Sequence, residues 1–240
     1  MPDQIDQALL DEIRRQMEAR KITMAAISGT FNMIHPNPQK RIDGLHRLGV
    51  MARACRSLGT SIITLCTGTR DPEDMWRRHP ENDSPEAWQD LITSMREALN
   101  IAEENQVMLG VEPEMANVIN SARKARRLLD ELRSPCLKIV MDGANLFQRS
   151  NLARMREILD EAFALLGQDI VIAHAKDLNQ DGEVGTLPAG KGVLDYDHYV
   201  WLLRNSGFQG PLILHSLTEP QVNDSVAFLE SKLRDTEKGK

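Results

Sequence analysis

The chain has 240 residues, and its 29 lysines and arginines stand against 35 aspartates and glutamates, a formal net charge of -6. Because a net acidic surface repels polyanions, the composition argues against an extended interface with nucleic acid or anionic lipid. Cys55, Cys66 and Cys136 lie far apart, and no apolar run approaches the ~20 residues of a membrane span, so we expect a cytoplasmic protein with reduced thiols.

Short apolar runs rich in β-branched residues alternate with longer amphipathic segments along the chain. This alternation is typical of βα units that build a parallel sheet. A helix is expected over Ile5–Arg20, before the first strand. The strands are then expected at Ile22–Ser28, Ser61–Cys66, Val107–Glu112, Leu137–Asp142, Ile170–His174 and Pro211–His215, with helices at Arg41–Leu58, Ser84–Asn105, Ser121–Arg133, Asn151–Leu166 and Tyr196–Ser206.

The number of expected strands bears on the fold class. An α/β barrel closes with eight strands and commonly takes roughly 200–250 residues as one domain. The length fits, but the six strands expected here are two short of closure. We therefore expect residues 1–240 to form a single TIM (β/α)8-type barrel domain that is N-terminally incomplete and lacks the first two strands.

Four of the expected strands end in a side chain that can bind a metal, namely Glu112, Asp142, His174 and His215. Parallel strands place their C-terminal ends at one rim, where barrel enzymes keep their chemistry, so these groups should converge. One such residue alone would more often be a rim carboxylate or a core histidine. Four at equivalent positions predict one site for a single divalent ion, and Mn²⁺, Mg²⁺, Co²⁺ or Zn²⁺ suits such a mixed donor set.

The same residues carry a resemblance to the xylose isomerase-like TIM barrels, also called AP endonuclease family 2. Glu112, in Gly-Val-Glu-Pro-Glu, is similar to the family's first metal glutamate, and Asp142, in Val-Met-Asp-Gly-Ala-Asn-Leu, to its metal aspartate. His174, in His-Ala-Lys-Asp, resembles the family's histidine ligand, and a Gly-x-Gly-x-x-Asp turn follows at 190–195. The resemblance covers nearly the whole chain from about residue 5 and implies sugar phosphate isomerases and epimerases, ketose 3-epimerases, inosose dehydratases or endonuclease IV.

Two positions depart from the family pattern. The last strand of the family usually ends in a glutamate that is both a metal ligand and half of an acid/base pair. Here that strand ends in His215, and Glu219 lies in the loop beyond it. Asn145 stands where the family often has a histidine, three residues after the metal aspartate. A symmetric transfer of a proton between two glutamates is therefore not implied, and either His215 or Glu219 could replace the missing group.

Further polar residues at the expected rim are candidate substrate ligands. His35 follows the first strand. Arg70 follows the second, where it could hold a phosphate or carboxylate through paired hydrogen bonds, although a surface ion pair explains it equally well. Lys176 could polarise a substrate oxygen or could form an ion pair at its strand end. Glu114 is the remaining candidate, together with Asn145 and Glu219 named above.

We expect an isomerase or epimerase that acts on a sugar, sugar phosphate or polyol through an enediolate. Glu112 is the expected catalytic base, and His215 or Glu114 would return the proton from the other side. Three alternatives stay open: a metal-dependent dehydratase, an endonuclease IV-like hydrolase, and a non-catalytic sugar-binding relative. The expected partner is a small sugar or polyol and neither nucleic acid nor membrane, with homo-oligomerisation left open.

Overall fold

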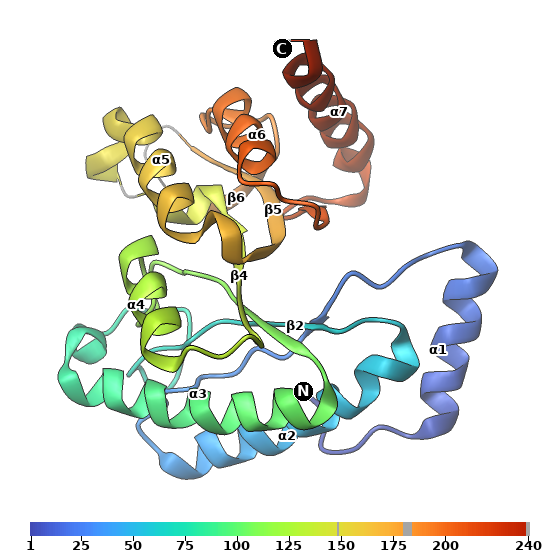
Figure 1. Cartoon of the computed structure of the whole chain (residues 1–240), viewed down its shortest axis with the longest axis vertical. Coiled ribbons are helices and arrows are strands. Elements are labelled where there is room, and N and C mark those ends of the chain that lie inside the picture. Colours follow the sequence, from blue (N-terminus) through green and yellow to red (C-terminus); the bar gives the residue numbers. More distant parts are fainter. Residues whose placement is uncertain (148, 180–183, 239–240) are drawn as a thin grey trace. The chain divides into compact units, whose positions relative to one another are not determined.

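Parallel strands alternate with helices throughout the computed structural model, which describes residues 1–147, 149–179 and 184–238 (Figure 1). The chain divides into two units. One comprises Met1–Asn120 with Arg127–Lys138, and the other comprises Ser121–Arg126 with Ile139–Lys240. We call them unit 1 and unit 2. In the described residues, no helix has the length and apolar character needed to cross a membrane.

Unit 1 contains three parallel strands and the helices between them. The strand β2 lies between β1 and β3, and the backbone N–H of Leu109 in β3 donates to the carbonyl of Cys136, just before β4. The helices α2 and α3 lie side by side (Figure 1). The elements are α1 Gln7–Arg20, β1 Ile27–Ser28, α2 Pro38–Leu58, β2 Ile62–Leu65, a 3-10 turn η1 Pro80–Asp83, α3 Pro85–Asn105, β3 Met108–Val111, and parts of α4 Ala122–Leu132 and β4 Leu137–Asp142.

The ends of the unit 1 helices follow from local sequence. The Asn37 side chain accepts a hydrogen bond from the backbone N–H of Gln39 and starts α2, whose end is marked by Gly59 at a φ of 75°. Such caps satisfy backbone groups that have no partner within the helix. Ser84 starts α3 in the same way. The core beneath these helices includes side chains with no exposed surface, among them Leu48, Ile63, Leu65, Leu91, Met95 and Leu109.

Unit 2 is built around β5, which has a parallel neighbour on each side, β4 and β7, while β6 pairs with it antiparallel. Ion pairs link its helices, His198 of α6 to Asp160 of α5 and Lys232 of α7 to Asp197 of α6. The elements after β4 are the 3-10 turns η2 Gly143–Leu146 and η3 Arg149–Arg154, α5 Met155–Leu166, η4 Gly167–Asp169, β5 Ile170–Leu178, β6 Val184–Pro188, α6 Tyr196–Asn205, β7 Leu212–Leu214, η5 Glu219–Gln221 and α7 Val222–Lys238.

The prediction of six parallel strands, with helices between them, is confirmed within the described part of the chain. The first strand is shorter than expected, because only Ile27 and Ser28 pair with β2. The segment Asn151–Leu166, expected as one helix, begins as a 3-10 turn and becomes α-helical at Met155. These differences concern the ends of elements, where local sequence is least decisive.

Two elements were not predicted. The strand β6, Val184–Pro188, carries no strong alternation of apolar and polar residues, and it exists because the long β5 offers a free edge over Lys176–Leu178. The helix α7 was overlooked although its sequence signals it. Val222, Val226, Leu229 and Leu233 recur at helical spacing, and Leu229 is buried.

Two glycines of α2 give a matched test of packing. A Cβ at Gly44 would lie 2.1 Å from the ring of Phe31, whereas at Gly49 the nearest atom would be the end of the flexible Arg53 side chain at 3.4 Å. Gly44→Ala should therefore lower the free energy of unfolding by about 1–3 kcal/mol. Gly49→Ala should raise it by about 0.5–1 kcal/mol, since alanine favours a helix. Urea unfolding of both variants would measure this, and equal effects would contradict the packing described.

Candidate metal centre

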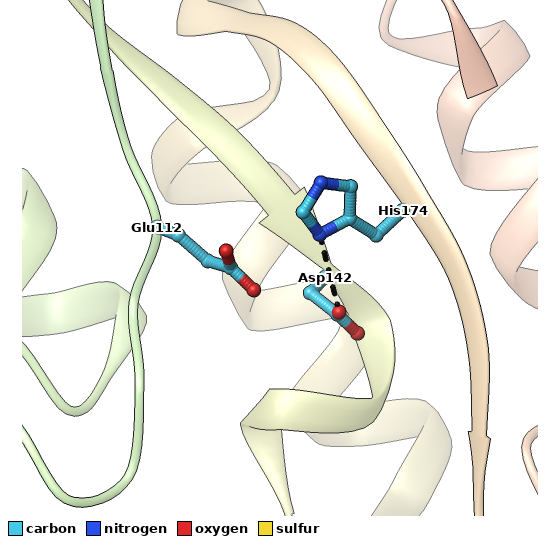
Figure 2. A group of neighbouring side chains, drawn as sticks. All are labelled: Glu112, Asp142 and His174. Carbon is cyan, nitrogen blue, oxygen red and sulfur yellow. Dashed lines mark ion pairs between the residues drawn. The ribbon is translucent and has the colours of Figure 1, made fainter. Parts of the chain in front are cut away.

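Asp142 and His174 face each other on two adjacent strands of unit 2. Asp142 ends β4, whereas β5 continues to Leu178, four residues past the end that the sequence predicted at His174. In the parallel register of β4 and β5, Asp142 is the partner of His174. Both side chains are buried, with 1% of Asp142 and 9% of His174 exposed. His174 Nδ1 lies 3.4 Å from Asp142 Oδ2, an ion pair that Figure 2 marks with a dashed line. The register of the sheet therefore brings together two of the four predicted metal residues.

Lys176 adds a positive charge to this pair. It lies two residues after His174 on β5, so both side chains leave the same face of the strand. The Lys176 side chain is also buried, and its Nζ lies 3.1 Å from Asp142 Oδ2. Burial by itself would raise the pKa of Asp142, but the neighbouring His174 imidazole and Lys176 ammonium outweigh it and hold that pKa below its ordinary value. Asp142 is thus a carboxylate in the folded protein.

The donor atoms suit a divalent ion. Asp142 Oδ1 accepts a hydrogen bond from the Ala144 backbone, whereas its buried Oδ2 accepts none of good geometry from the described residues. Asp142 and His174 each offer one ligand atom in unit 2, and Glu112, directly after β3 in unit 1, offers a carboxylate oxygen as the third candidate ligand. Figure 2 draws the same three side chains. Two carboxylates and an imidazole are a donor set found around zinc, manganese and magnesium, so the residues fit the ion that the sequence predicts.

His215, the fourth predicted ligand, follows β7. Its ring stacks on that of His174, with centroids 5.0 Å apart and 15° between the planes. Its Nδ1 lies 2.9 Å from the Ser216 hydroxyl. A role for His215 as a ligand stays a prediction.

Asp177 holds the loop that follows β5 and β6. Its Oδ1 accepts hydrogen bonds from the backbone N–H groups of Leu178 and Leu194, and its Oδ2 accepts one from Gly190. A Cβ at Gly192 would lie 2.4 Å from Asp177 Oδ1, so the loop passes directly over the carboxylate. The last residue of the His-Ala-Lys-Asp motif therefore shapes the Gly-x-Gly-x-x-Asp turn, which explains the two motifs together.

Two predicted substrate residues in unit 1 make contacts within that unit. Arg70 forms an ion pair with Asp90 at 2.7 Å and donates to the Ile34 carbonyl. An ion pair was the alternative to a substrate ligand at this position. His35 Nδ1 accepts a hydrogen bond from the Asn37 backbone, and its Nε2 lies 3.1 Å from the Pro72 carbonyl. Both residues stabilise the loops after β1 and β2.

The remaining candidates differ in burial. Glu114 is partly buried after β3, and its carboxylate lies 3.4 Å from the Ala116 backbone N–H. Asn145 is buried in η2, three residues after Asp142. Glu219 is exposed at the first position of η5. Glu114 and Asn145 are thus at least partly buried, whereas Glu219 is exposed.

Three asparagines connect the loops of unit 1 through hydrogen bonds. Asn32, after β1, bonds to the Thr69 backbone through both its amide oxygen and its amide nitrogen. Asn117 accepts a hydrogen bond from the Gly68 backbone at 2.6 Å. Asn82 joins the backbone after β2 to the backbone after β3. Asparagines in loops are common, so no signal in one sequence marks these three as cross-links.

Comparison with known proteins decides the family. A family model described as "Xylose isomerase-like TIM barrel" matches residues 1–232. The chain belongs to this family. The resemblance read from the sequence motifs is thus confirmed, and so is the predicted fold class, a TIM-type α/β fold.

Two curated relatives carry the name of the same enzyme. L-ribulose-5-phosphate 3-epimerase UlaE of Salmonella typhi is 30% identical over 138 residues, which cover 58% of this chain and 46% of the relative. The enzyme of the same name from Shigella flexneri serotype 5b is 25% identical over 189 residues, which cover 79% of this chain and 61% of the relative. The chain thus spans about half to three fifths of the length of these relatives.

Solved structures of the family share the fold at low identity. A D-tagatose 3-epimerase-like protein has a TM-score of 0.78 and 15% identity, covering 97% of this chain and 85% of that chain. The IOLI protein with a bound zinc atom has a TM-score of 0.71 and 16% identity, and the match covers 95% of this chain and 81% of that chain. A Mycobacterium smegmatis protein in complex with magnesium has a TM-score of 0.73 and 16% identity, and the match covers 98% of this chain and 80% of that chain. At such identities the likeness shows the fold alone.

Replacing Asp177 should loosen the loop over it. Asp177→Ala removes the acceptor of the Gly190 and Leu194 N–H groups, and loss of the buried bond to Leu194 costs about 1–3 kcal/mol. We expect amide hydrogen exchange at these two residues to become at least about tenfold faster. Asp224→Ala is the control, because the ion pair that Asp224 forms with Lys191 is exposed. Unchanged exchange in Asp177→Ala would contradict this role.

Proposed function

We propose that the chain is a metal-dependent isomerase or epimerase of a sugar, sugar phosphate or polyol. The observation that carries the proposal is the buried Asp142–His174 pair, whose members are register partners on β4 and β5. Membership of the family supports it, because both curated relatives described above are sugar phosphate 3-epimerases. A phosphorylated ketopentose is accordingly the first substrate to test.

One divalent ion is proposed, held by Glu112, Asp142 and His174, with His215 as the fourth ligand. Two solved structures of the same fold contain zinc and magnesium, so manganese, magnesium, cobalt and zinc are all candidates here. When bound, such an ion supplies a Lewis acid that polarises adjacent substrate oxygens and makes the α-proton more acidic. Lys176, beside Asp142, adds a further positive charge next to the site.

Proton transfer is assigned to side chains at the strand ends. Glu112 follows β3 and is the proposed base that removes the proton from the α-carbon of the substrate. His215 or Glu114 is the proposed group that returns a proton on the opposite face. Lys176 is buried and would hold a substrate oxygen as negative charge develops on the enediolate.

Exchange of the substrate proton with solvent tests the function directly. In D₂O with Mn²⁺, the chain should replace the C3 proton of L-ribulose 5-phosphate by deuterium, because an epimerase must break that C–H bond. Loss of the C3 signal in proton NMR would measure this. Exchange should stop when a chelator removes the ion. If neither this substrate nor an unphosphorylated ketose exchanges a proton in the metal-loaded chain, the proposed activity is wrong and a non-catalytic sugar-binding role is favoured.

Glu112→Gln separates the proposed base from the fold. The amide keeps the shape of the side chain but removes its charge and basicity, so turnover should fall by roughly 10²–10⁴-fold, and weaker metal binding would add to the loss. Thermal unfolding without metal should change little. Glu104→Gln, on the exposed end of α3, is the matched control and should keep full activity. Full activity of Glu112→Gln would remove Glu112 from the mechanism.

A further inference from the structure

Tyr199 connects the two strands that carry Asp142 and His174. It lies on α6, and its side chain has no exposed surface. Its hydroxyl lies 3.0 Å from the carbonyl oxygen of Met141 on β4 and 3.1 Å from that of His174 on β5. A single O–H group is thus shared between two neighbouring strands.

The two carbonyls belong to the peptide groups that set the direction of the ligand side chains. A peptide group is planar and contains the Cα atoms on both sides of it. The plane that holds the Met141 carbonyl also contains the Cα of Asp142, and the plane that holds the His174 carbonyl contains the Cα of His174. A donor that fixes both oxygens therefore fixes the positions from which the carboxylate and the imidazole extend.

The ring of Tyr199 is itself held in place. It meets the rings of Phe163 and Tyr196 edge to face, with centroids 5.9 and 6.1 Å away. A Cβ at Gly143, directly after Asp142, would lie 3.0 Å from the Tyr199 ring. The absence of a side chain at this position lets the ring approach the end of β4, so the hydroxyl is positioned by packing before any ion binds.

We propose that Tyr199 is a positioning residue of the metal centre, whose hydroxyl holds the backbone of β4 next to Asp142 and that of β5 at His174 at the separation that a divalent ion requires. The inference rests on the proposed function, since it assumes that these two residues bind an ion. Metal sites tolerate displacements of only about 0.5 Å in their ligands. Groups that orient the ligands typically contribute 10–100-fold to metal affinity.

Binding of Co²⁺ alone, followed by visible absorption and titration calorimetry on the 240-residue chain, tests this role. Tyr199→Phe keeps the ring and removes the hydroxyl, and its dissociation constant for Co²⁺ should rise about 10- to 100-fold with a changed absorption band. Tyr196→Phe is the matched control. Tyr196 lies on the same helix, and its hydroxyl donates to the carbonyl of Lys176, which is not one of the two ligand residues. The variant's dissociation constant should stay within about threefold of wild type, an effect smaller than loss of an orienting group.

The outcomes distinguish this inference from the proposed function. A wild-type chain that binds no divalent ion would overturn both. Wild-type affinity in Tyr199→Phe, or an equal loss in the two tyrosine variants, would overturn the positioning role alone. If Tyr199→Phe does not fold, Gly143→Ala keeps the hydroxyl but displaces the ring, and it should weaken Co²⁺ binding in the same way. Unchanged binding in Gly143→Ala would then reject the inference.

Discussion

A carboxylate removed from water sets the arrangement of unit 2. Burial disfavours the charge on Asp142, so neighbouring groups must compensate for the water that it loses. Two side chains of β5 do so. His174 and Lys176 reach Asp142 together because alternate residues of a strand share a face. A slip of β5 by one residue against β4 would turn both away from the carboxylate. The electrostatics of the site and the register of the sheet are therefore one constraint.

The opposite face of β5 has a structural task. Asp177 points away from the cluster and binds the backbone of the turn at 190–195. Tyr196 starts α6 directly after this turn, and Tyr199 follows one helical turn later. The short motif at the end of β5 thus fixes one face by charge and, through the turn, fixes the start of the helix that carries Tyr199. The strand β5 thus carries the candidate ligand His174 and also Asp177, which positions the turn before the helix of Tyr199.

The alternation of short apolar runs with amphipathic segments was sufficient to predict the parallel strands. Buried strands are continuous apolar runs, and the polar residues that follow them are easy to recognise. Asp142 and His174 were found in this way, and their contact follows from strand order. The contacts of Arg70 with Asp90 and of Tyr199 with two carbonyls could not be predicted, since they join residues that are distant in the sequence and carry no shared pattern. The strand β6 depends on the free edge of β5 rather than on its own residues, so its sequence alone did not reveal it.

The hydrogen bonds between asparagine side chains and the loop backbone of unit 1 have a thermodynamic consequence. Asn32, Asn82 and Asn117 order the loops that follow β1, β2 and β3, and a Cβ at Gly68 would lie only 2.1 Å from the Asn32 side chain. The conformational entropy of these loops is therefore lost when the chain folds, not when a ligand arrives. A molecule that binds beside them meets a preorganised surface, and its affinity reflects the contacts it makes with little reduction for ordering the protein.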